Sequence, residues 1–132
     1  MPTITGGHHI ALTVRNVEES AAWYCELLGL QVVLEGDDPT VRFRVLADPD
    51  SGWVLGVRQY DDHEEGTFDE LRTGLDHFAF GVSSLEELQA WQERLQELGV
   101  IHSPIAETPI GTVIVFRDPD NIQLEFWLPA DQ

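Results

Sequence analysis

The stretch HIALTVRNVEESAAW at residues 9–23 decides the fold, because it recurs as HFAFGVSSLEELQAW at residues 77–91. The two copies align at an offset of 68 residues without a gap. Later landmarks repeat in the same order: LGL at 28–30 is answered by LGV at 98–100, and DPD at 48–50 by DPD at 118–120. Matches in the same order over both halves predict a tandem duplication.

Each copy predicts a strand followed by a helix. Residues 8–14 and 76–82 alternate or run apolar, as strands do. Asn16 and Ser84 then stand where helix caps are expected, and Gly29 and Gly99 stand where helices end. Apolar residues at helical spacing place the two helices at 17–28 and 85–97.

Three further strands are expected in each copy, the last two joined by the Asp-Pro-Asp turn. They are expected at 31–35, 41–47 and 53–60 in the first copy, and at 101–105, 111–117 and 122–128 in the second.

The chain is therefore expected to form one α+β domain, residues 1–132, from two tandem βαβββ units. The first unit spans 7–60 and the second 75–128, and the linker at 61–74 is acidic, with a short helical turn at Phe68–Leu71. Neither unit is large enough to close a core alone. Two curved mixed sheets facing each other across a pseudo-twofold axis would form a cupped cavity, with the helices outside.

The strongly acidic composition limits the kinds of molecule that the protein is expected to bind. The formal net charge is −17, from 24 acidic and 7 basic residues. Such a field repels nucleic acid and anionic membranes and attracts metal ions or basic small molecules, although acidity also serves solubility. The first residues, MPTITGGHH, lack the pattern of a signal peptide, and no apolar run reaches membrane-spanning length. A cytoplasmic protein is expected.

The duplication also suggests a site. His9 and His77 are equivalent by the repeat and are expected to face each other across the cavity. Small residues, Ala11 and Ala79 among them, point to the same face two positions on and leave room for a ligand. His8 is expected on the opposite face of its strand and is the second choice.

Glu125 is the third candidate, because it is a lone carboxylate in the otherwise apolar strand 122–128. Such a group is costly unless it is paired or bound to a metal. Two imidazoles and one carboxylate suit Fe(II), Mn(II), Ni(II) or Zn(II) and leave positions open for substrate and for water or O₂. Two alternatives stay open. The histidines can be core residues inherited by duplication, and Glu125 can face solvent.

Other polar and aromatic residues have weaker roles. His63 in the linker and His102 at a strand start are expected at the surface, or else as acids or bases behind the metal. Arg58 and Tyr60 end a strand and are expected at the cavity mouth. The large aromatic residues of the strands are expected in the core, with one or two forming an apolar wall for a substrate: Phe43, Phe80, Phe116 and Trp127.

Four motifs resemble the vicinal oxygen chelate superfamily. They are the His-x-x-Leu-x-Val opening at His9, the helix ending at 27–30, the Gly-Leu-Asp-His start at 74–77 and the ending at 118–125. The resemblance covers residues 7–128 and implies the glyoxalase/bleomycin resistance/dioxygenase fold. The superfamily includes glyoxalase I, extradiol dioxygenases, methylmalonyl-CoA epimerase, fosfomycin-resistance enzymes and bleomycin-resistance proteins.

The resemblance carries over to particular residues. The superfamily takes its metal ligands from the first and last strands of each unit, which His9, His77 and Glu125 match. A fourth ligand position, filled in glyoxalase I, falls near Leu55 or Gly56, where this chain has none. The three-ligand set is similar to that of extradiol dioxygenases, and Glu125 is expected to serve catalysis as well as the metal.

The expected function is that of a metal-dependent small-molecule enzyme, a dioxygenase or a lyase or isomerase, with oxygenase-type chemistry favoured. A divalent ion would chelate vicinal oxygens of the substrate. The alternative is an antibiotic- or metabolite-binding protein without turnover, as in bleomycin resistance. The exposed edges of curved sheets favour a homodimer.

Overall fold

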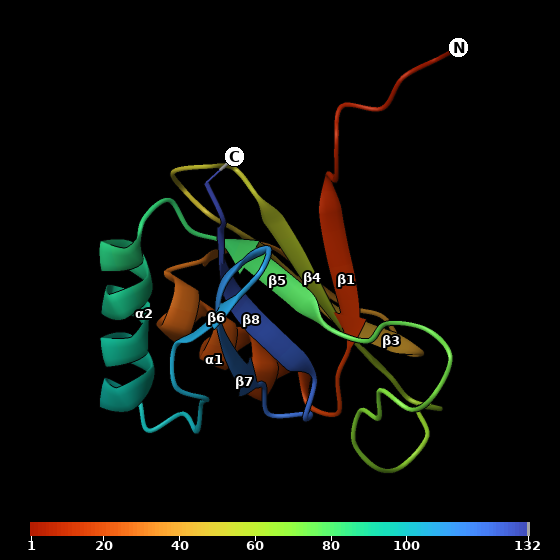
Figure 1. The fold of residues 1–132 in the computed structure, drawn as a ribbon. Coiled ribbons are helices and arrows are strands. Elements are labelled where there is room, and N and C mark those ends of the chain that lie inside the picture. Colours follow the sequence, from red (N-terminus) through yellow and green to blue (C-terminus); the bar gives the residue numbers. More distant parts are fainter. Residues whose placement is uncertain (132) are drawn as a thin grey trace. The chain divides into compact units, whose positions relative to one another are not determined.

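The computed structural model describes residues 1–131, in two compact units, Met1–Glu65 and Gly66–Gln132. Both described units have the element order strand, helix and three strands that the repeat predicts (Figure 1). The first unit consists of β1 (His9–Thr13), α1 (Val17–Leu28), β2 (Gln31–Asp37), β3 (Val41–Ala47) and β4 (Val54–Tyr60). The second consists of β5 (Phe78–Gly81), α2 (Leu85–Glu97), β6 (Ala106–Thr108), β7 (Gly111–Arg117) and β8 (Gln123–Pro129).

The two sheets have equivalent topologies. Their strand orders are β1-β4-β3-β2 and β5-β8-β7-β6, and in each the first strand runs parallel to the last while the other neighbours are antiparallel. Both are therefore mixed sheets, and the α+β class predicted from the sequence is confirmed.

Both helices have the bounds that the sequence predicts, because their caps form. Asn16 Oδ1 accepts a hydrogen bond from the Glu19 backbone N–H at 3.0 Å, and Ser84 Oγ accepts one from that of Glu87 at 3.1 Å. Gly29 follows α1 with a φ of 72°, a left-handed conformation that favours glycine and closes the helix.

In the first unit, α1 packs on one face of β3 and β4. The contact buries Tyr24 and Leu27 of the helix and Leu46 and Leu55 of the strands, each at most 1% exposed. Because side chains alternate along a strand, the neighbours of Leu46 and Leu55 point to the opposite face. That face remains open to a ligand.

In the second unit, α2 lies against β8 and β7 (Figure 1). An aromatic cluster joins the layers: Trp91 of the helix stacks on Phe126 with ring centroids 4.5 Å apart, and Phe126 stacks on Phe116 at 4.9 Å. Phe80 packs on Phe126 at 5.9 Å. Phe116 thus belongs to the core as expected, whereas Phe80 and Trp127 are only half-buried.

The prediction of a strand at 101–105 is wrong. Only His102 makes an isolated bridge, to Phe116, and the strand β6 begins at Ala106. Pro104 has no N–H to donate, and the Ser103 hydroxyl accepts the Val115 N–H at 2.9 Å in place of a backbone carbonyl. Apolar residues at these positions gave the appearance of a regular strand.

The helical turn expected at Phe68–Leu71 is not a helix. Among the described residues between β4 and β5, the chain makes only turns and bends, including one closed by the Arg72 N–H and the Asp69 carbonyl at 3.2 Å. The Phe68 N–H donates to the Asp120 carbonyl at 2.8 Å, which ties this segment to the turn before β8. Neither described helix has the length and apolarity that a membrane crossing requires.

Candidate functional site

His77 and Glu125 meet at the start of the second unit's sheet. His77 directly precedes β5, and Glu125 lies in the middle of β8, opposite Ala79. The carboxylate is buried, with 8% of the residue exposed, and its Oε2 lies 3.7 Å from His77 Nε2. Two donors that are each about 2.1 Å from one ion are about 3.0 Å apart in an octahedral site and about 3.4 Å apart in a tetrahedral one, so the pair would have to close by a few tenths of an ångström to share a metal ion.

Asp76 holds the imidazole of His77 in one orientation. A carboxylate only accepts hydrogen bonds, so His77 Nδ1 donates to Asp76 Oδ1, at 2.6 Å. This bond raises the pKa of His77 above its usual value; burial opposes the rise, and the charge of Glu125 adds to it. In the neutral ring the lone pair is then on Nε2, the atom that faces Glu125, which is the arrangement of metal-binding histidines.

A hydrogen-bonded chain behind Glu125 fixes its carboxylate. Arg117 Nη2 donates to Gln123 Oε1 at 3.1 Å, and Gln123 Nε2 donates to Glu125 Oε1 at 3.2 Å. Because a guanidinium has no acceptor, the orientation of the Gln123 amide is forced. Glu125 Oε1 is thereby engaged, whereas Oε2 faces His77.

Glu70 anchors this chain from the segment before β5. Its two oxygens accept from Arg117 Nη1 at 3.2 Å and Nη2 at 3.0 Å, a bidentate pair. The hydrogen bonds from Arg117 lower the pKa of Glu70 from 4.5 to about 2. A carboxyl group whose pKa falls on folding stabilises the native state above its unfolded pKa, and that stability is lost as the pH falls.

We therefore expect Glu70→Gln to make the free energy of unfolding less dependent on pH in the acid range. The wild-type protein should be the more stable above about pH 4.5, and its advantage over the variant should shrink between about pH 4.5 and 2. Urea unfolding midpoints measured across this range test it, with Glu93→Gln on the exposed side of α2 as the control. An advantage that stayed constant down to pH 2 would contradict the assignment.

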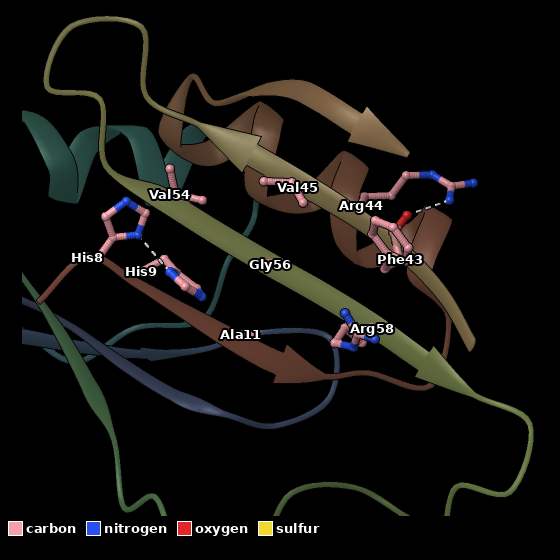
Figure 2. A pocket seen from close by; sticks show the side chains of 9 residues that line it. All are labelled: His8, His9, Ala11, Phe43, Arg44, Val45, Val54, Gly56 and Arg58. Atoms are coloured by element: carbon pink, nitrogen blue, oxygen red, sulfur yellow. Dashed lines mark hydrogen bonds between the residues drawn. The ribbon is translucent and has the colours of Figure 1, made fainter. Parts of the chain in front are cut away.

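The first unit carries His9 on the open face of its sheet. A cavity of about 290 Å³ lies there. Figure 2 shows the residues that line it, with His8 and His9 toward one end and Arg58 toward the other. Residues of β1, β3 and β4 line it, including Ala11, Phe43 and the backbone of Gly56. Arg58 lines the cavity as the sequence suggests, and Phe43 forms its apolar wall rather than part of the core.

The expectation that His8 faces away from His9 is wrong. Both residues line the same cavity, and their Nδ1 atoms are hydrogen-bonded at 2.8 Å (Figure 2). His8 precedes the first residue of β1, so the alternation of a strand does not govern its direction. His8 is therefore a further polar group at this end of the cavity.

The sheet registers identify the position in the first unit that corresponds to Glu125. Glu125 lies opposite Ala79 on one side and Val115 on the other; Gly56 lies opposite Ala11 and Val45. Since Ala11 and Ala79 are equivalent in the repeat, Gly56 is the counterpart of Glu125. The choice that the sequence left between Leu55 and Gly56 thus falls on Gly56, and Leu55 packs under α1.

The structure brings two of the three predicted ligands together. His77 and Glu125 belong to one unit and His9 to the other, so the participation of His9 stays a prediction. Residues 1–131 contain no group of three or more His, Cys, Asp or Glu side chains close enough to hold a metal ion. Asp76 and Gln123 were missed, although each has a signal: one adjoins His77, and the other lies two residues before Glu125 on the same face.

The remaining histidines bond to nearby backbone. His63 Nδ1 lies 3.0 Å from the Glu64 carbonyl oxygen, and His102 Nδ1 lies 2.7 Å from that of Ser103. Both residues are partly exposed, in keeping with the surface positions that the sequence predicts. These contacts give them a local structural role.

The comparisons with known proteins agree with this fold. The family model of the Glyoxalase/Bleomycin resistance protein/Dioxygenase superfamily matches residues 6–126, and the chain belongs to this superfamily. A curated relative, the uncharacterized protein YwkD of Bacillus subtilis, is 32% identical over 123 residues, which are 91% of this chain and 94% of the relative.

Solved structures show the same architecture. The glyoxylase/bleomycin resistance protein/dioxygenase domain from Frankia sp. EAN1pec is 37% identical, with a TM-score of 0.89 over 97% of this chain and 100% of that one. A mutant of the fosfomycin resistance protein FosX from Listeria monocytogenes, complexed with Mn(II) and dihydroxypropylphosphonic acid, has a TM-score of 0.69 at 24% identity, covering 95% of this chain and 90% of that one. At that identity the second likeness establishes the fold alone.

Proposed function

We propose that this protein is a metal-dependent enzyme acting on a small molecule, with His9, His77 and Glu125 as the ligands of one divalent ion. The observation that carries the proposal is the buried Glu125 carboxylate facing His77 Nε2 at 3.7 Å. With a proton on Nδ1, neutral His77 presents a lone pair to an anionic oxygen. That approach is favourable only with a cation or a proton between the two atoms.

Asp76 and Glu125 raise the pKa of His77 and so also favour a proton between the two atoms; what supports a metal is the orientation of both donors. Asp76 behind His77 and Gln123 behind Glu125 orient both donors, as the outer partners of metal ligands do. Gly56, at the position equivalent to Glu125, offers no side chain. A site completed by His9 would thus have three protein ligands and open positions for substrate oxygens and water or O₂.

When bound, a divalent ion would supply Lewis acidity toward two neighbouring substrate oxygens, or an O₂-activating centre. Glu125 would contribute negative charge, and its fixed Oε1 would keep the carboxylate from rotating. The absence of a fourth protein ligand favours oxygenase-type chemistry over the glyoxalase type. Iron in the purified protein would favour the former, and nickel or zinc an isomerase or lyase.

The second candidate is an antibiotic- or metabolite-binding protein without turnover. The observation in its favour is the net charge of −17, which attracts cationic drugs. Retained binding of a cationic antibiotic by metal-free protein would favour this candidate. The homodimer also remains a proposal, supported by β2, an edge strand whose Val32, Val33 and Leu34 side chains are 44–59% exposed.

Elemental analysis of the purified protein tests the enzymatic proposal. We expect about one transition-metal ion per chain, and at least about tenfold weaker metal binding in His77→Ala, because a ligand and the orienting contact to Asp76 are lost together. His63→Ala is the matched control. It also removes an imidazole, but one whose Nδ1 contacts the backbone carbonyl of the next residue, Glu64. Equal metal binding by wild type and His77→Ala would overturn the proposal.

A further inference from the structure

The cavity of the first unit has a charge opposite to that of the chain. The chain carries −17, yet the ionisable side chains lining this cavity in the described residues are all basic: His8, His9, Arg44 and Arg58. The remaining lining is apolar or glycine. Arg44 alternates with Phe43 and Val45 along β3, so its side chain leaves the sheet on the same face as Leu46. Arg58 is therefore the arginine that offers this cavity a positive charge, in a chain that is otherwise strongly acidic.

The two arginines differ in their availability. Arg44 Nη1 donates to Asp37 at 3.0 Å and its Nε lies 3.5 Å from Glu35, so its charge is already compensated. Arg58 forms no ion pair with a carboxylate among residues 1–131. Its Nε donates to the Tyr60 hydroxyl at 3.0 Å.

Aromatic rings hold the Arg58 guanidinium in place. Its central carbon lies 5.3 Å from the ring centroid of Phe43 and 5.7 Å from that of Tyr60, within the range of cation–π contacts. With Nε engaged by Tyr60, the two terminal nitrogens keep four N–H donors for a ligand. A planar fork of this kind matches the two oxygens of a carboxylate.

We infer that this cavity binds a small organic carboxylate, with its carboxylate on Arg58 and its apolar body against Phe43, Val45 and Val54. A volume of about 290 Å³ restricts it to a small molecule. Val54, which lies opposite His9, and Arg58 are four residues apart on β4, a span of about 13 Å. The inference rests on the proposed function in one respect: the end of the cavity away from Arg58 lies beside the candidate metal ligand His9.

Binding of three matched probes to metal-free protein tests the inference. They are phenylacetate, its neutral amide phenylacetamide, and the cation phenethylamine, measured by isothermal titration calorimetry in EDTA. We expect phenylacetate to bind at least about tenfold more tightly than either other probe. Arg58→Gln should weaken its binding about 10- to 100-fold, the range for a hydrogen bond to a charged group.

Arg42→Gln is the matched control, because Arg42 adjoins Phe43 on the same strand but pairs with Glu18 and Asp37 outside the cavity. It removes the same charge, and binding should change less than about twofold. Arg58→Lys, which keeps the charge without the fork, should be intermediate. Thermal unfolding of each variant confirms that the fold is kept.

Equal binding of the acid and the amide, tighter binding of the amine, or equal losses in Arg58→Gln and Arg42→Gln would overturn the inference. Because these titrations contain no metal and the elemental analysis contains no ligand, either hypothesis can fail while the other stands.

Discussion

Glu125→Gln is expected to weaken the binding of a divalent metal by more than about 100-fold while the fold persists. Glutamine has nearly the same shape as glutamate, and its amide can still pair with Gln123, so the buried position stays filled and hydrogen-bonded. What is lost is the negative charge opposite His77 Nε2. Metal titration of EDTA-treated protein, followed by calorimetry, measures the effect.

Glu107→Gln provides the control for Glu125→Gln. Glu107 is an exposed carboxylate on β6 of the same unit, and its replacement removes the same charge from the same sheet. Its metal affinity should match that of the wild type. A Glu125→Gln protein that bound metal as tightly as this control would exclude Glu125 as a ligand.

Phe126→Ala is expected to lower the free energy of unfolding by about 3–5 kcal/mol, the range for removing a buried aromatic residue. Phe126 is 1% exposed and contacts three other rings, Trp91 of α2 among them. Its loss opens a void where the helix meets the sheet. Urea denaturation measures the change, with Leu71→Ala, at a residue 90% exposed, expected within about 0.5 kcal/mol of wild type. A cost below about 1 kcal/mol for Phe126→Ala would mean that the cluster is not the core of this unit.

The helices were predictable because their signals are local. A side-chain cap such as Asn16 and a left-handed glycine such as Gly29 act within one turn of the chain, so both bounds of α1 can be read from neighbouring residues. The strand at 101–105 failed because strand pairing is not local. The Val115 N–H, twelve residues away, donates to the Ser103 hydroxyl instead of to a backbone carbonyl, and no local signal in the sequence predicts this.

The residues of the candidate site also fall into those that the sequence predicts and those that depend on distant contacts. His77 and Glu125 could be proposed from the repeat and from an isolated carboxylate in an apolar strand. The support of Glu125 by Arg117 and Glu70 could not be predicted, because it depends on how the segment before β5 folds back on β7. The basic lining of the first unit's cavity was also hidden, since the acidic composition indicated cationic ligands instead.

Gly56 makes the two copies of the duplicated unit unequal. Where one copy has Glu125, the other has bare backbone that lines the cavity, and a Cβ there would lie only 3.3 Å from that of Ala11. A side chain at this position would press on Ala11, and its outer atoms would enter the cavity, so glycine keeps this half open to a ligand. The same duplicated frame thus carries a buried carboxylate in one half and an open cavity in the other.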